Sequence, residues 1–156
     1  MKTSIGITPK NLLEVSKVLN VLLADEHILY IKTRKAHWNI EGKDFLTMHN
    51  FFEDQYKQIE TIIDELAERI RTIGHYAVGS LTEFLELTHL SEKSNSKTDS
   101  ATFMKILLED HESIIIHIRE QLDKVGEDLK DEGTNDFLTG LLKAHEKMAW
   151  MLRAHL

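Results

Sequence analysis

The chain contains no cysteine, one proline and seven glycines among its 156 residues. Without cysteine there are no disulfides and no thiolate metal sites, so histidine, aspartate and glutamate would have to hold any metal ion. The shortage of proline and glycine favours long uninterrupted helices over a sheet with many turns. The sequence therefore predicts a single all-α domain, and its available metal ligands suit iron, manganese or zinc.

The chain also lacks long apolar runs and an excess of positive charge. No stretch approaches the roughly 18 apolar residues of a membrane span, and residues 1–9 have no apolar leader core. We therefore expect a cytoplasmic protein without membrane contacts. The net charge of -7 disfavours broad contact with nucleic acid, because DNA affinity comes largely from Lys and Arg that neutralise phosphates. The same negative charge favours the binding of cations.

Apolar residues spaced by threes and fours predict four long helices. Thr8 and Pro9 form the pattern of an N-cap and a first helical residue, after a short tail of about residues 1–7. Gly42 is expected to end the first helix, and Asp44 to cap the second. The predicted helices span about residues 9–37, 45–73, 101–125 and 135–156.

The connections between these helices have unequal lengths. The first and third are short, which makes the helices that they join antiparallel neighbours. The second, of about 25 residues, is long enough to cross the bundle and make the second and third helices parallel, as in ferritin-like folds. It contains one short apolar piece, LTEFLEL. The loop pattern therefore predicts a ferritin-like four-helix bundle with one crossover, as a single domain over residues 1–156.

The second predicted helix carries a stripe of polar side chains beside its apolar face: His49, Glu53, Asp64 and Glu68. The first two and the last two are each spaced i, i+4, which allows both side chains of a pair to bind one ion. The two pairs are about 22 Å apart along the helix, at a rise of about 1.5 Å per residue, whereas metal bonds are about 2 Å long. One chain cannot bring both pairs to one ion.

Two copies of this helix, packed antiparallel about a two-fold axis, would bring the pairs face to face. Residues whose numbers have a constant sum then lie opposite each other, and both His49 with Glu68 and Glu53 with Asp64 give 117. His37, at the end of the first helix, is placed to join His49. The pattern predicts two equivalent metal sites between two subunits. The alternative, that these charged residues only face solvent, stays open on the residues alone.

Other polar and aromatic patterns indicate no site. Glu86 and His89 match the Glu-x-x-His pattern of di-iron sites inside bundles, but they fall in the long connection, so we interpret the match as coincidence. On the residues alone, Trp38 and Trp150 are expected to be core aromatics. Packing or solvation is expected for the remaining histidines, which are His27, His75, His111, His117, His145 and His155.

Two segments, KAHWNIEGKDFLTMHNFFEDQY and IDELAERIRTIG, resemble the Dps family, the mini-ferritins named for DNA protection in starved cells. The likeness covers nearly the whole chain, and it is specific because the His-Trp-Asn, the second histidine and the DELAER segment occur in order. The resemblance implies a homo-oligomeric shell of twelve four-helix subunits, a dodecamer. It also implies a short extra helix in the second connection, which here would be LTEFLEL.

The resemblance further implies ferroxidase centres between two-fold-related subunits, each binding two iron ions (Fe2+/Fe3+). His37, His49 and Glu53 would come from one subunit, and the partner would supply the two remaining carboxylates, Asp64 and Glu68. Many relatives have aspartate where Glu53 stands. The longer side chain keeps the charge but changes how an iron ion would be bridged.

By the same resemblance, Fe(II) would be oxidised, preferably by hydrogen peroxide, and stored as an Fe(III) mineral inside the shell. Trp38 occupies the position of a family tryptophan that is thought to intercept radicals beside the centre. Iron would enter through acidic pores near the start of the fourth helix, although a solvated acidic turn remains an alternative there. The candidate pore residues are Asp131 and Asp136, which we favour, and Glu127, Asp128 and Glu132.

DNA binding is expected to be weak or absent, despite the family name. Relatives that bind DNA strongly use a lysine-rich tail, whereas this chain has only Lys2 and Lys10 before the bundle and ends with RAHL. A competing hypothesis is a non-enzymatic shell that coats DNA or has a structural role. In such a shell, the carboxylates and histidines would only hold the subunits together.

Overall fold

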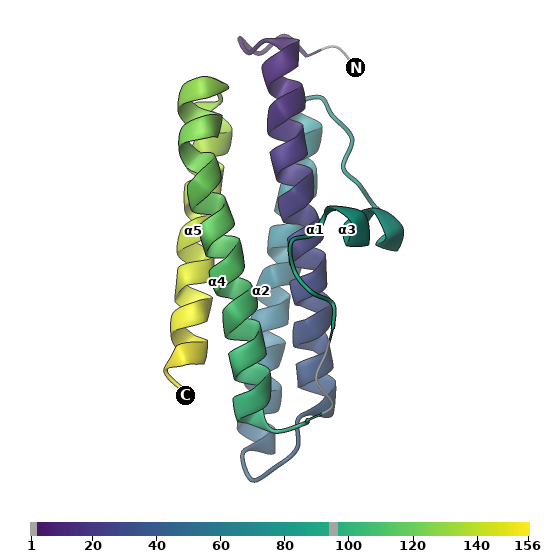
Figure 1. Cartoon of the computed structure of the whole chain (residues 1–156), viewed down its shortest axis with the longest axis vertical. Helices are drawn as coiled ribbons and strands as arrows, with labels where there is room; N and C mark the ends of the chain where they lie inside the picture. The colour runs from purple at the N-terminus through teal and green to yellow at the C-terminus, as the bar shows by residue number, and fades with distance from the viewer. Residues whose placement is uncertain (1–2, 94–96) are drawn as a thin grey trace.

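A computed structural model describes residues 3–93 and 97–156, and within these residues it contains helices and no strand (Figure 1). Lys2 of the predicted tail lies outside the described residues. The all-α prediction is confirmed. No helix in the described parts of the chain is long and apolar enough to cross a membrane. In chain order the elements are α1 (Pro9–Asn39), α2 (Phe45–Thr72), α3 (Leu81–Leu87), α4 (Ser100–Asp123), the π-helical turn η1 (Lys124–Asp128) and α5 (Glu132–Arg153).

The long helices α1, α2, α4 and α5 form the bundle, and the long connection crosses it (Figure 1). α1 and α2 run antiparallel, as do α4 and α5, whereas α2 and α4 run in the same direction. The crossover carries α3 against α1, and α3 coincides with the predicted LTEFLEL piece. A reciprocal capping box starts this short helix, because the Ser80 side chain accepts from the Glu83 backbone and the Glu83 side chain accepts from the Ser80 backbone. The predicted ferritin-like topology is confirmed.

The helix starts follow local capping chemistry, with two departures from the prediction. The Thr8 side chain accepts a hydrogen bond from the backbone N–H of Asn11, and Pro9 is the first helical residue, as predicted. Asp44 stands at the N-cap of α2, but its side chain makes no capping hydrogen bond. α5 begins at Glu132, three residues before the predicted start, because the side chain of Asp131 caps it.

The core lies along one face of each long helix. On α2 this face contains Phe52, Ile59 and Leu66, which are fully buried. The polar stripe of α2 lies beside this face and stays accessible. The prediction that both tryptophans belong to the core is wrong, because Trp38 is 59% exposed and Trp150 is 61% exposed. At the end of α1 the buried positions are taken by Ala36 and His37, and the neighbouring Trp38 lies on the solvent side.

A polar cluster of Arg69, Asp131 and Thr134, here called the polar joint, connects the start of α5 to the end of α2. Asp131 Oδ1 accepts from the Thr134 backbone N–H at 2.9 Å and from Arg69 Nη2 at 3.1 Å. Asp131 Oδ2 accepts from Thr134 Oγ1 at 2.6 Å. Asp131 is only 2% exposed. In the subunit this carboxylate is therefore used as a helix cap and in an ion pair, and its part in a pore stays a prediction.

The joint predicts that Asp131→Ala lowers the free energy of unfolding by about 2 kcal/mol, the upper range for loss of an N-cap. Asp136→Ala is the matched control, because Asp136 is an exposed acidic residue on the same helix. Denaturant unfolding at one fixed protein concentration measures both. Equal stability of the two variants would contradict a structural role for Asp131.

Candidate metal centre

His37 and His49 form a reciprocal pair across the tight link between α1 and α2. Nδ1 of His37 donates to the backbone carbonyl of His49 at 2.8 Å, and Nδ1 of His49 donates to the backbone carbonyl of His37, also at 2.8 Å. The two rings stack with centroids 3.8 Å apart and an angle of 23° between their planes. Two residues that are twelve positions apart in the chain are thereby held as one unit.

These two hydrogen bonds determine which ring nitrogens can bind a metal. A carbonyl oxygen only accepts, so each Nδ1 must carry a proton. In the neutral rings the lone pair is therefore on Nε2, the nitrogen that remains for an ion. Outer hydrogen bonds of this kind orient the histidine ligands of metal sites and fix their tautomers. The link between the helices thus prepares both imidazoles for metal binding.

Aromatic rings support the histidine pair on both sides. The Phe45 ring stacks against His49 with centroids 5.2 Å apart, and the Tyr56 ring meets His37 edge-on at 5.3 Å. His37 is 9% exposed, while His49 is partly buried. Both rings therefore have little freedom to rotate, and this reduces the conformational entropy that metal binding would remove.

Glu53 lies one turn beyond His49 on α2, and its carboxylate is held by a lysine. Glu53 Oε1 is 2.6 Å from Lys57 Nζ. This hydrogen bond, with the Lys57 charge and smaller effects of His37 and His49, holds the pKa of Glu53 below its usual value. The carboxyl group is therefore ionised at neutral pH, as a metal ligand must be.

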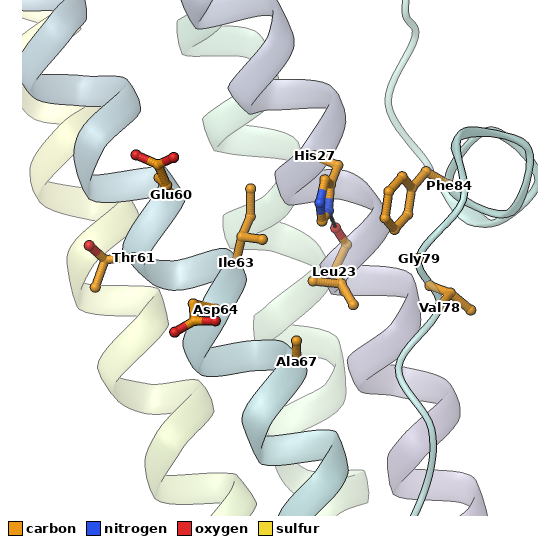
Figure 2. Close-up of a pocket in the computed structure, with 10 residues that line it drawn as sticks. All are labelled: Leu23, His27, Glu60, Thr61, Ile63, Asp64, Ala67, Val78, Gly79 and Phe84. Atoms are coloured by element: carbon orange, nitrogen blue, oxygen red, sulfur yellow. Dashed lines mark hydrogen bonds between the residues drawn. The ribbon is translucent and has the colours of Figure 1, made fainter.

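Asp64 and Glu68 are exposed on the same side of α2, away from the histidines along the helix. Asp64 also lines a surface pocket of about 650 Å³ (Figure 2). The pocket lies between α2, α1 and the segment that carries α3, and Glu60 and His27 also line it. Among residues 3–93 and 97–156, no three His, Asp or Glu side chains converge on one ion position. Within these residues, one subunit therefore does not bring the five predicted ligands together at one ion position.

Known proteins resemble the chain over almost its full length. A family model described as a ferritin-like domain matches residues 16–156. The DNA protection during starvation protein 2 of Bacillus anthracis is 35% identical over 92% of this chain and 97% of its own length. The chain belongs to the Dps family of ferritin-like proteins.

Two further relatives extend the comparison of this Dps protein. An uncharacterised low temperature-induced protein of Nostoc is 39% identical over 98% of this chain and 86% of its own length. A solved structure of the Dps protein of Vibrio cholerae O1 has a TM-score of 0.88, with 29% identity and 98% of each chain covered. Its description places it in a broad superfamily of ferritin-like diiron-carboxylate proteins.

Trp38 of this Dps protein is exposed and follows His37 in the chain, in a group of rings around one arginine. The Arg34 guanidinium lies 5.0 Å from the Trp38 ring centroid and 4.7 Å from that of Tyr56. Arg34 Nη1 also donates to the Tyr30 hydroxyl at 2.7 Å. Such cation–π contacts hold the rings in place. The radical-intercepting role of Trp38 stays a prediction.

The remaining candidate pore residues of this Dps protein are at the α4–α5 junction. Glu127 and Asp128 belong to η1, while Glu132 and Asp136 belong to the first turns of α5. All four are exposed, in contrast to Asp131. They remain candidates for attracting cations, and their part in a pore stays a prediction.

Sequence reasoning missed a buried polar cluster in the bundle of this Dps protein. Glu26 on α1, His111 on α4 and His145 on α5 are each at most 1% exposed. Nε2 of His145 lies 2.7 Å from Glu26 Oε1, and Nδ1 of His145 lies 3.0 Å from Nδ1 of His111. Both histidines are buried, as packing residues are, but they are also paired with polar groups on other helices.

Spacing along one helix could not reveal this cluster, because its members come from three helices. One signal was present: Glu26 falls on the apolar stripe of the first helix, between Leu22 and Leu29. A carboxylate on a buried stripe requires a polar partner. The identity of that partner depends on how the helices pack.

The cluster predicts how stability depends on pH. Burial, and then the neighbouring His145, keeps the pKa of His111 well below its usual value of 6.5, so the folded protein holds this ring neutral. The unfolded chain takes up a proton there below pH 6.5, so the contribution of His111 to stability falls as the pH drops below 6.5. We expect His111→Gln to reduce the slope of the free energy of unfolding against pH by up to about 1.4 kcal/mol per pH unit.

Denaturant unfolding at several values between pH 7 and about pH 5 measures the effect of His111→Gln. His155→Gln is the control, because His155 is exposed, its Nδ1 bonds to the Met151 carbonyl, and its ring contacts the Phe51 ring. The same pH slope in wild type and His111→Gln would contradict the assignment of His111 as a buried neutral base.

Proposed function

We propose that the protein is a ferroxidase and iron-storage protein. Two Fe(II) ions bind at each site between two-fold-related subunits, hydrogen peroxide oxidises them preferentially, and Fe(III) mineral is deposited inside a dodecameric shell in the cytoplasm. This activity protects the cell from oxidative damage. The observation that carries the proposal is the His37–His49 pair, whose Nε2 atoms are prepared for ligation beside the ionised Glu53.

The five ligands would differ in which oxidation state of iron they favour. Imidazole nitrogen from His37 and His49 suits Fe(II), while carboxylate oxygen favours the harder Fe(III) product. Glu53 would belong to the histidine half of the site, and Asp64 and Glu68 of the partner subunit would complete it. Because three groups come from one chain and two from the other, only the assembled pair of subunits would bind iron fully.

Two adjacent ions explain why peroxide is a suitable oxidant. Each Fe(II) gives one electron to the same molecule of hydrogen peroxide, the O–O bond breaks, and two protons complete two water molecules. A single Fe(II) would supply one electron only and would release a hydroxyl radical. The diiron-carboxylate description of the Vibrio cholerae relative supports a paired-ion centre. Glu127, Asp128, Glu132 and Asp136 would attract Fe(II) towards the shell.

The alternative is a shell that coats DNA without oxidising iron. The name of the Bacillus anthracis relative refers to DNA protection. In this chain the net charge of -7 opposes phosphate binding, so we propose weak or absent DNA binding. Oxidation kinetics separate the two hypotheses, because a structural shell does not need the imidazoles for redox chemistry.

Replacing both histidines, in His37→Ala with His49→Ala, is expected to reduce the rate of Fe(II) oxidation by peroxide at least about tenfold. Loss of the groups that orient metal ligands already lowers metal affinity or activity by that factor, and loss of the ligands should do no less. The rate is measured from Fe(III) absorbance after rapid mixing of Fe(II)-loaded protein with peroxide.

The matched control is His75→Ala with His155→Ala, which removes two imidazoles outside the proposed site. Light scattering confirms that each variant assembles as the wild type does. Wild-type oxidation rates in the double variant His37→Ala with His49→Ala would defeat the ferroxidase proposal and favour the structural shell.

A further inference from the structure

We propose that Lys57 occupies Glu53 in the separate subunit and divides its time between Glu53 and Glu60 of the partner subunit when two subunits meet. Formation of the pair would then make Glu53 more available for metal binding, although not fully free of the lysine. This inference rests on the proposed metal site between subunits. It adds a residue that controls access to that site and is not itself a ligand.

In the subunit, Lys57 competes directly with a metal ion for the Glu53 carboxylate. Lys57 Nζ is 2.6 Å from Glu53 Oε1, one helical turn away. The Lys57 side chain is 58% exposed, whereas that of Glu53 is 32% exposed. An ammonium group and a divalent cation need the same carboxylate oxygens, so full coordination by Glu53 requires Lys57 to leave.

The register of the proposed pair supplies a new partner for the lysine. The ligand pairs His49 with Glu68 and Glu53 with Asp64 share one numerical sum, and Lys57 with Glu60 has the same sum of 117. An antiparallel packing that completes the metal sites therefore also places Lys57 opposite Glu60 of the partner subunit. The two-fold axis makes this exchange occur twice, once for each site.

The surface around Glu60 is suited to receive a lysine. Glu60 and Asp64 line the pocket of about 650 Å³ beside α3 (Figure 2). Among the described residues, neither carboxylate forms a salt bridge, and Glu60 Oε1 accepts a long hydrogen bond from the Tyr30 hydroxyl at 3.4 Å. Ile63 and Phe84 provide apolar walls for the methylene stem of a lysine, while the carboxylate attracts its ammonium group.

The exchange predicts opposite effects for the two members of the new pair. Without Lys57, Glu53 is always available, so metal binds more tightly. Without the Glu60 charge, Lys57 remains on Glu53, so metal binds more weakly. When Lys57 is absent, Glu60 has no lysine to attract, and its replacement should have no further effect. A purely structural role for Lys57 or Glu60 does not predict opposite changes in metal affinity, nor that the effect of replacing Glu60 disappears when Lys57 is absent.

Zn²⁺ binding to the full-length assembled protein, followed by titration calorimetry, tests the exchange without redox chemistry. We expect Lys57→Met to tighten binding by up to about fivefold and Glu60→Gln to weaken it by up to about fivefold, the range for an exposed ion pair. The double variant should match Lys57→Met. Lys57→Arg, which keeps the charge, should bind Zn²⁺ as the wild type does.

Lys17→Met is the matched control, because Lys17 forms an equally exposed ion pair with Glu14 at 2.7 Å outside the proposed site. It should leave Zn²⁺ affinity unchanged. Unchanged affinity in both Lys57→Met and Glu60→Gln would overturn the exchange, as would a shift in the same direction in both. A Glu60→Gln effect that persists in the double variant would also overturn it, because Glu60 would then act without the lysine.

The variant His37→Ala with His49→Ala separates this inference from the proposed function. Loss of Zn²⁺ binding in that variant, together with no effect of Lys57→Met or Glu60→Gln, refutes the lysine exchange alone. Wild-type Zn²⁺ binding in that variant refutes the proposed metal site itself, and the lysine exchange is refuted with it.

Discussion

The reciprocal hydrogen bonds between His37 and His49 are the interaction on which the rest of the account depends. Each imidazole donates its Nδ1 proton to the backbone carbonyl of the other residue, and so each Nε2 keeps its lone pair. The same bonds close the turn between α1 and α2 and fix the two helices relative to each other. One local arrangement therefore contributes both to the fold of this Dps protein and to its candidate metal chemistry.

A second constraint is the length of α2. The rise of about 1.5 Å per residue separates the two acidic residues near its C-terminal half from the histidine pair by more than any metal bond can span. This distance limits a single subunit to part of a site. A two-fold axis would bring the missing ligands from a second subunit. The ion pair between Lys57 and Glu53 is consistent with a site divided between two subunits, because Lys57 neutralises the Glu53 carboxylate while no metal ion is bound.

Local chemistry made much of the fold predictable, whereas contacts between helices did not follow from the sequence. Apolar spacing and connection lengths predicted the crossover bundle, and LTEFLEL corresponds to α3. The exposure of Trp38, the burial of Asp131 and the Glu26–His145 contact were missed. Each depends on a neighbouring helix that spacing within one segment does not reveal. The polar stripe of α2 and the place of His37 could be predicted because they depend on a single helix and one tight link.

Complementation between two inactive variants would show whether two chains share one site. One variant carries His37→Ala with His49→Ala, and the other carries Asp64→Ala with Glu68→Ala. Refolded together, a mixed pair has one site with all five ligands and one site with Glu53 alone. If the site is shared, co-assembled shells regain Fe(II) oxidation that neither variant shows separately. Mixed shells that remain as inactive as the separate variants would contradict a shared site.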